Sequence, residues 1–257
     1  MKHLLAAALL VCATAVFAEI KVETVEYKSG DVVCEGYLAY DTAQAGPRPG
    51  VVIVHDWMGN GAFSKKKAED IAALGYVAFA ADIYGKGVRP KDAKEASAQA
   101  GKYKNDRPLL RARVNAALDT LKASGKADPK RIASMGFCFG GTTALELARS
   151  GADVVGTVTF HGGLSSPTPA DAKNIKGKEL ILHGADDPHV NASEVAAFKK
   201  EMDDAKIPYT FVAYPGAVHS FTNPAAGTDV SKGSAYNEAA DKASWIAMTE
   251  FFAQVLK

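Results

Sequence analysis

Residues 132–141 read Ile-Ala-Ser-Met-Gly-Phe-Cys-Phe-Gly-Gly, and residues 142–148 continue as Thr-Thr-Ala-Leu-Glu-Leu-Ala. The first half is a short apolar run typical of a buried strand, and the continuation has helical character. A strand that turns sharply into a helix holds its central residue, here Cys138, in a strained backbone conformation. A side chain at Gly136 or Gly140 would collide with neighbouring backbone in such a turn. The helix N-terminus beside Cys138 would favour a thiolate.

The spacing Gly-x-Cys-x-Gly resembles the nucleophile elbow of the α/β-hydrolase architecture, with Cys138 where serine is usual. The alternative is a buried structural cysteine, because free cysteine is among the most buried residue types. The rest of the chain therefore has to decide between a nucleophile and a core residue.

The composition is that of an ordinary soluble globular protein. The 257 residues are 47% hydrophobic and 23% charged. The net charge of +1 gives no electrostatic argument for nucleic acid or an anionic membrane as a partner.

Residues 1–18 are typical of a secretory signal peptide. A short basic start precedes the apolar run Leu4–Val16, and small residues precede Glu19. We expect cleavage after Ala18 and a periplasmic or secreted protein that does not bind membranes. An uncleaved anchor is the alternative, although the apolar run is short for a membrane span. Residues 19–257 contain no linker-like stretch, so we expect one domain.

Two cysteines, Cys34 and Cys138, remain after this cleavage. Two cysteines in an exported chain could form a disulfide. Cys34 lies in a predicted strand, however, and oxidation would inactivate a nucleophile at position 138. We therefore expect two free thiols.

Hydrophobic periodicity predicts a mostly parallel sheet with helices on both faces, which is an α/β fold. Residues 20–27 and 32–40 alternate apolar and polar side chains, as in an antiparallel N-terminal hairpin at one sheet edge. Further strands are predicted at 51–55, 76–81, 154–160, 179–183 and 209–214, and helices at 64–74, 91–104, 107–124, 191–204 and 235–256.

Candidate catalytic partners follow two of the later strands. Asp186 and Asp187 follow strand 179–183, and His219 follows strand 209–214. The order nucleophile, acid, histidine is that of the α/β-hydrolase architecture, in which all three meet at one sheet edge. The imidazole of His219 would accept the thiol proton and return it to the leaving group, and either aspartate would orient the imidazole.

An oxyanion hole in this architecture uses the backbone N–H after the nucleophile and one from the loop after an early strand. Phe139 and Trp57 occupy these positions. Asp56 is unexpected there, because its carboxylate would repel the developing negative charge.

Five segments together resemble the dienelactone hydrolase family (carboxymethylenebutenolidase-like proteins) over essentially the whole mature chain. These segments are Val-Ile-Val-His-Asp-Trp-Met-Gly (52–59), Ala-Asp-Ile-Tyr-Gly (81–85), Gly-Phe-Cys-Phe-Gly-Gly (136–141), His-Gly-Ala-Asp-Asp-Pro (183–188) and Gly-Ala-Val-His-Ser-Phe (216–221). The resemblance implies a monomeric α/β-hydrolase that cleaves lactones or enol esters with a Cys-His-Asp triad and no cofactor. It puts the acid on Asp187, and it implies that Asp56, where the family has glutamate, helps to deprotonate Cys138.

Substrate recognition departs from the family. In the family, two arginines bind a substrate carboxylate. This sequence has Lys86 and Asn223 at the corresponding positions, and neither residue offers the planar, charged guanidinium group of arginine. The alternative is that Lys86 is a solvated loop lysine that does not contact substrate. Tyr84, His161 and Phe221 complete the predicted substrate-binding set, although His161 could equally be a core or rim histidine.

No pair among His55, His183, His189 and Asp186 has the spacing of a zinc motif, so we expect no metal. The sequence thus predicts hydrolysis of small lactones or activated enol esters through an acyl-cysteine. A broad carboxylesterase or thioesterase with the same triad is one alternative. A non-catalytic small-molecule binding protein on the same fold is another.

Overall fold

Strands form one sheet in the computed structural model, which describes residues 19–257, so the predicted signal peptide lies outside the described residues. The sheet has eight strands in the order β1-β2-β4-β3-β5-β6-β7-β8. Their bounds are β1 Ile20–Ser29, β2 Val32–Asp41, β3 Arg48–Val54, β4 Val77–Ala81, β5 Ala127–Phe137, β6 Gly156–Phe160, β7 Lys178–Gly184 and β8 Tyr209–Tyr214. The predicted hairpin is confirmed, because β1 and β2 pair antiparallel at one edge and β2 pairs antiparallel with β4. All pairings from β4 to β8 are parallel.

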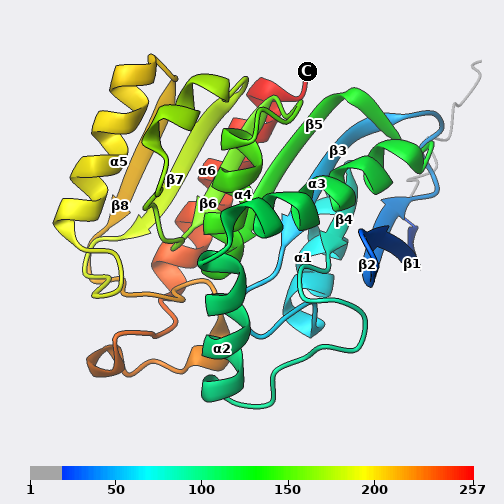
Figure 1. Ribbon diagram of the computed structural model, residues 1–257. Helices are drawn as coiled ribbons and strands as arrows, with labels where there is room; N and C mark the ends of the chain where they lie inside the picture. The colour runs from blue at the N-terminus through cyan, green and yellow to red at the C-terminus, as the bar shows by residue number, and fades with distance from the viewer. Residues whose placement is uncertain (1–18) are drawn as a thin grey trace, which may run out of the picture.

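Helices cover both faces of this sheet, as predicted (Figure 1). Their bounds are α1 Ala62–Ala73, α2 Ala93–Lys104, α3 Arg107–Ala123, α4 Phe139–Arg149, α5 Ala192–Ala205 and α6 Glu238–Val255, with short 3-10 turns η1 Pro169–Asn174, η2 Pro224–Ala226 and η3 Val230–Lys232. The last helix begins later than predicted, because the side chain of Asn237 accepts the N–H of Ala240 and caps it there. Among residues 19–257, no helix has both the length and the apolarity to cross a membrane.

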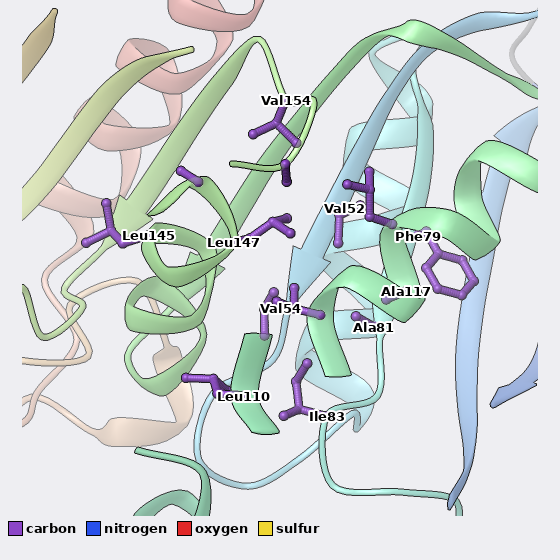
Figure 2. Packing of buried hydrophobic residues seen from close by; sticks show 14 of the residues in the cluster. Val52, Val54, Phe79, Ala81, Ile83, Leu110, Ala117, Leu145, Leu147 and Val154 are labelled. Atoms are coloured by element: carbon purple, nitrogen blue, oxygen red, sulfur yellow. The ribbon is translucent and has the colours of Figure 1, made fainter. Parts of the chain in front are cut away.

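The continuous apolar run of β3 is buried on both sides. Val52 and Val54 pack with residues of α3 and α4, as Figure 2 shows. Val51 and Ile53 belong to the opposite core layer, which contains residues of α1 and α6. Alternation of side chains along a strand thus divides the hydrophobic residues between two layers of helices.

The candidate functional residues follow the carboxyl ends of successive parallel strands. Asp56 and Trp57 follow β3, Tyr84 follows β4, Cys138 follows β5, His161 follows β6, Asp187 follows β7 and His219 follows β8. Because parallel strands all end at the same edge, this topology brings together residues that are far apart in the sequence.

Candidate active site

Cys138 lies at the predicted sharp turn between β5 and α4, with φ 54° and ψ −116°. A Cβ added to Gly136 would lie 2.0 Å from the carbonyl oxygen of Gly140, and one added to Gly140 would lie 2.2 Å from that of Val54. The glycines therefore permit close backbone packing around the strained backbone of Cys138. The N–H of Cys138 donates to the carbonyl of Phe160 at 3.0 Å, which ties the turn to β6.

His219 and Asp187 form a hydrogen-bonded pair beside the thiol. The distance between His219 Nδ1 and Asp187 Oδ2 is 2.8 Å. The other oxygen of Asp187 accepts the N–H of His189 at 2.8 Å. Asp186 is exposed, and its carboxylate accepts the N–H of Gly216 instead. Of the two candidate aspartates, Asp187 is the one that contacts the imidazole.

Neighbouring charges stabilise the imidazolium form of His219. Burial acts to lower the pKa of His219, but the negative charge of Cys138 and hydrogen bonds to Asp187 and Cys138 outweigh it and raise the pKa to about 10. Burial acts to raise the pKa of Asp187, and the hydrogen bond and charge of His219 overcome this effect and lower it. The arrangement therefore places an imidazolium, oriented by a carboxylate, beside the sulfur of Cys138.

Two backbone N–H groups near the thiol are available for an oxyanion. Neither Trp57 N–H nor Phe139 N–H donates a hydrogen bond to any part of the chain that the structure describes. Phe139 is the first residue of α4, where backbone donors have no partner within the helix. Both N–H groups are therefore free to donate hydrogen bonds to a substrate oxygen.

Side chains from two strand ends hold the loop that carries Trp57. The hydroxyl of Tyr84 donates to the carbonyl of Trp57 at 3.0 Å. His55 Nδ1 donates to the carbonyl of Asp56 at 2.6 Å, and its Nε2 accepts the N–H of Ile83 at 3.2 Å. Burial lowers the pKa of His55 to about 4, so its ring is neutral and can serve as one donor and one acceptor.

Asp56 borders the same cavity as Cys138. Its side chain is half-buried, and its Oδ1 accepts the N–H of Met58 at 2.8 Å. Burial raises the pKa of this carboxyl, and the hydrogen bond from Met58 offsets only part of the effect. The carboxylate is therefore a stronger base than an aspartate in water.

A cavity of about 720 Å³ opens over the thiol. Two predicted substrate-binding residues, His161 and Asn223, line it. The Nε2 atom of His161 lies 2.8 Å from the hydroxyl of Thr222, and its ring packs edge-on against His219 with centroids 5.2 Å apart. This volume is within the range of about 300–1,000 Å³ of sites for drug-sized ligands.

Three other predicted substrate contacts lie outside the cavity, which corrects the sequence-based set. Lys86 is on the surface and pairs with Glu26, because its backbone N–H bonds to β2 in a turn of glycines with positive φ. Tyr84 is buried and supports the loop of Trp57. Phe221 is fully buried behind His161, with ring centroids 5.1 Å apart.

One wall of the cavity was not expected from the sequence. Helix α2 contributes Ser97, Ala100, Gly101 and Lys104 to the lining. Their spacing places them on one face of a helix, but nothing in a polar helix indicates which face will point to a distant active site. Among residues 19–257, Lys104 is the one lysine or arginine that lines this cavity.

The histidines around the thiol do not form a metal site. Within residues 19–257, no three His, Cys, Asp or Glu side chains are arranged to hold a metal ion. Cys34 and Cys138 are both free thiols, and Cys34 is buried.

Comparisons with known proteins agree with this geometry. Residues 34–256 match the model of the dienelactone hydrolase family. The chain is 31% identical to protein usf of Aquifex pyrophilus over 78% of this chain and 87% of that protein. It is 30% identical to a Bradyrhizobium protein named "Probable 2-oxo-3-(5-oxofuran-2-ylidene)propanoate lactonase", over 68% of this chain and 74% of that protein.

Solved structures give a similar result. The structure named m3DLH is 40% identical, with a TM-score of 0.89 over 93% of this chain and 99% of that chain. A dienelactone hydrolase-like promiscuous phosphotriesterase, P91, from metagenomic libraries is 39% identical, also with a TM-score of 0.89 over 93% of this chain and 99% of that chain. The fold, the arrangement around Cys138 and the match over most of the sequence lead to one conclusion: the chain belongs to the dienelactone hydrolase family and is a carboxylic ester hydrolase.

Proposed function

We propose that the protein hydrolyses small lactones or activated esters, enol esters among them, through an acyl intermediate on Cys138. The observation that carries this proposal is the His219–Asp187 hydrogen bond beside a thiol that itself raises the pKa of the imidazole. A thiolate is the nucleophilic form of cysteine, and an adjacent imidazolium stabilises it.

Acylation begins when the thiolate of Cys138 forms a bond to the substrate carbonyl carbon. The carbonyl electron pair moves to oxygen, which accepts hydrogen bonds from the N–H groups of Trp57 and Phe139. Collapse of this intermediate breaks the bond to the alcohol oxygen, and the imidazolium of His219 gives its proton to the departing alkoxide.

Deacylation uses the same histidine in its neutral form. The acyl group removes the negative charge on sulfur that helped to raise the pKa of His219. The neutral imidazole therefore persists long enough to accept a proton from water as the water attacks the thioester. Release of the acid regenerates the thiolate and the imidazolium.

The leaving group limits the substrates. A thiolate leaves easily, so the tetrahedral intermediate returns to substrate when the alcohol is a poor leaving group. Enol esters and enol lactones avoid this return, because their alkoxides are stable. Equal rates on alkyl and enol esters of matched size would contradict this preference and would favour the broad carboxylesterase or thioesterase.

The test measures p-nitrophenyl acetate hydrolysis by the wild type, Cys138→Ala and Cys138→Ser. We expect the alanine variant to lose turnover entirely, because no nucleophile remains. Equal turnover in all three proteins would mean that the activity does not depend on Cys138.

Alkylation by iodoacetamide at neutral pH tests how the thiol is activated. Cys138 should react faster than a free cysteine, and buried Cys34 is an internal control in the same digest. We expect His219→Asn to slow alkylation most and Asp56→Asn to slow it less, since Asp56 acts as the second base. Unchanged alkylation in Asp56→Asn would assign all thiol activation to His219.

Phosphotriester hydrolysis is a second candidate activity. The solved relative described as a promiscuous phosphotriesterase matches 93% of this chain at 39% identity. We expect slow hydrolysis of paraoxon that disappears in Cys138→Ala. Paraoxon turnover that survives in this variant would show that phosphotriester hydrolysis does not use Cys138 as its nucleophile.

A further inference from the structure

A glycine in the last turn of α2, Gly101, has no evident backbone or packing reason to be there. Gly101 does not have positive φ. A Cβ built on it meets no atom within 4 Å. Glycine in a helix interior costs about 1 kcal/mol relative to alanine, so the position carries a cost that the local structure does not require.

The space beside Gly101 belongs to the cavity over Cys138. Ser97, Ala100 and Gly101 form a wall of small residues along one face of α2. Gly101 lines this cavity, and a Cβ built on it meets no atom of another segment, so a side chain at position 101 would take up space at the cavity wall.

This wall is fixed close to the nucleophile. Tyr103, on the same helix, donates from its hydroxyl to the carbonyl of Tyr84 at 3.2 Å. Its ring stacks on Tyr84 with centroids 5.5 Å apart and meets the ring of Phe139 edge-on at 6.5 Å. Phe139 directly follows the nucleophile, so α2 is anchored beside the oxyanion hole.

The position of the proton donor, His219, determines how the alcohol and acyl parts of the substrate are oriented in the cavity. His219 comes from the loop after β8, and the leaving alcohol must face it to receive a proton. Helix α2 packs instead on Tyr84, which follows β4, a strand nearer the other edge of the sheet. Figure 1 shows α2 extending beyond the same end of the sheet from which the loop after β8 emerges. The acyl half of the substrate therefore points to the α2 wall.

The lining of the cavity is largely apolar. Met58 and Phe139 contribute apolar side chains, and Phe63 and Phe137 add aromatic rings from the α1 side of the sheet. Lys104 also lines the cavity, but it lies at the exposed C-terminal end of α2. A compact lactone would leave much of the cavity of about 720 Å³ empty.

We propose that Gly101 is a specificity-determining position and that the protein takes esters with a bulky, uncharged, apolar acyl group seated against α2. This inference rests on the proposed ester hydrolysis and names its acyl specificity.

The test compares two esters with the same leaving group, p-nitrophenyl acetate and p-nitrophenyl cyclohexanecarboxylate, on wild type, Gly101→Ala and Gly101→Leu. We expect Gly101→Leu to lower kcat/KM for the bulky ester on the order of 100-fold while the acetate ester changes little. Gly101→Ala should have an intermediate effect and a higher Tm, because alanine favours the helix.

Ala98→Leu is the matched control, because it adds the same side chain to an exposed position of α2 that does not line the cavity. Equal losses on both esters in Gly101→Leu, or no loss on the bulky ester, would overturn the proposal.

Alkylation of Cys138 separates this inference from the proposed function. If the wild type hydrolysed neither ester, the proposed function would fail, but the size limit could still be measured. Gly101→Leu should then block N-phenyliodoacetamide and leave iodoacetamide unaffected. Equal reactivity of the variant and the wild type towards both reagents would reject the α2 wall as a size limit.

Discussion

Tyr84 illustrates how a single residue can act on the chemistry without touching the substrate. Its hydroxyl donates to the carbonyl of Trp57, whose N–H is one of the two free donors near Cys138. The hydrogen bond fixes the loop before substrate arrives, which is how a preorganised site avoids reorganisation during the reaction.

We expect Tyr84→Phe to lower kcat about fivefold, since one lost hydrogen bond of about 1 kcal/mol has this effect on a rate. KM should change little, because Tyr84 does not line the cavity. Tyr27→Phe is the matched control, as it also removes a buried tyrosine hydroxyl bonded to a strand-end carbonyl. A rise in KM without a fall in kcat would mean that Tyr84 binds substrate.

The residues of the active site differ in how well the sequence predicted them. Cys138, Asp187 and His219 follow strand ends in the expected order, and the structure brings them together. Lys86 was predicted to line the pocket from its position in the family pattern, and Phe221 from its aromatic side chain. Their side-chain directions depend on the β2 contact and the inner packing, which a local motif does not contain.

At the scale of elements, β5 and α4 are joined by a turn that tolerates almost no added atoms. The carbonyl of Gly140 occupies the space where a Cβ of residue 136 would be, at 2.0 Å. Backbone cannot move aside as the end of a flexible side chain can, so strand, turn and helix would have to shift together.

Gly136→Ala should therefore destabilise the protein by about 3 kcal/mol or more, at or above the upper end for overpacked sites. It should also slow Cys138 alkylation by displacing the thiol. Urea unfolding measures the first effect and peptide mapping the second. Gly61→Ala is the control, because a Cβ there meets its nearest atom at 3.8 Å, and it should cost about 1 kcal/mol or less. Similar losses in both variants would contradict the steric explanation.

The elements themselves were largely predictable. The strand predicted at 209–214 and the helices at 107–124 and 191–204 agree with β8, α3 and α5 to within a residue or so. Local periodicity is sufficient where an element buries one continuous apolar face. The short turn η1 was not predicted, because six residues are too few to show a hydrophobic period.

At the scale of the whole molecule, a buried group of charges lies on the α4–α5 side of the sheet. Arg149 is fully buried and pairs with Glu146 at 3.1 Å and with Glu201 at 2.7 Å. Glu179 on β7 is also buried, and neither of its carboxyl oxygens has a hydrogen-bond partner in the described part of the chain. Burial raises its pKa to about 8, although the charge of Arg149 opposes the shift.

This raised pKa makes stability depend on pH. Between the ordinary glutamate value and about 8, the folded protein holds a proton that the unfolded chain releases. Stability from this group is therefore complete at low pH and is lost as the pH rises through about 8.

Glu179→Gln keeps the neutral form at every pH, so its Tm should match the wild type near pH 5 and exceed it by on the order of 10 °C near pH 9. Glu201→Gln is the contrasting variant and should lower Tm at both pH values, because it leaves the buried Arg149 with a weakened partner. A constant Tm difference for Glu179→Gln across this range would show that Glu179 is not protonated in the fold.

The sequence by itself determined the strand and helix pattern, the glycine-flanked turn at Cys138 and the order of nucleophile, acid and histidine. These depend on short spacings and on the rule that parallel strands end at one edge. The tertiary structure decided which helix face borders the cavity, where the side chains of Lys86 and Phe221 point and which charges are buried. Each of these depends on packing between segments far apart in the chain: the ring of Tyr103 on Tyr84 sets the rotation of α2, and no local pattern encodes that contact.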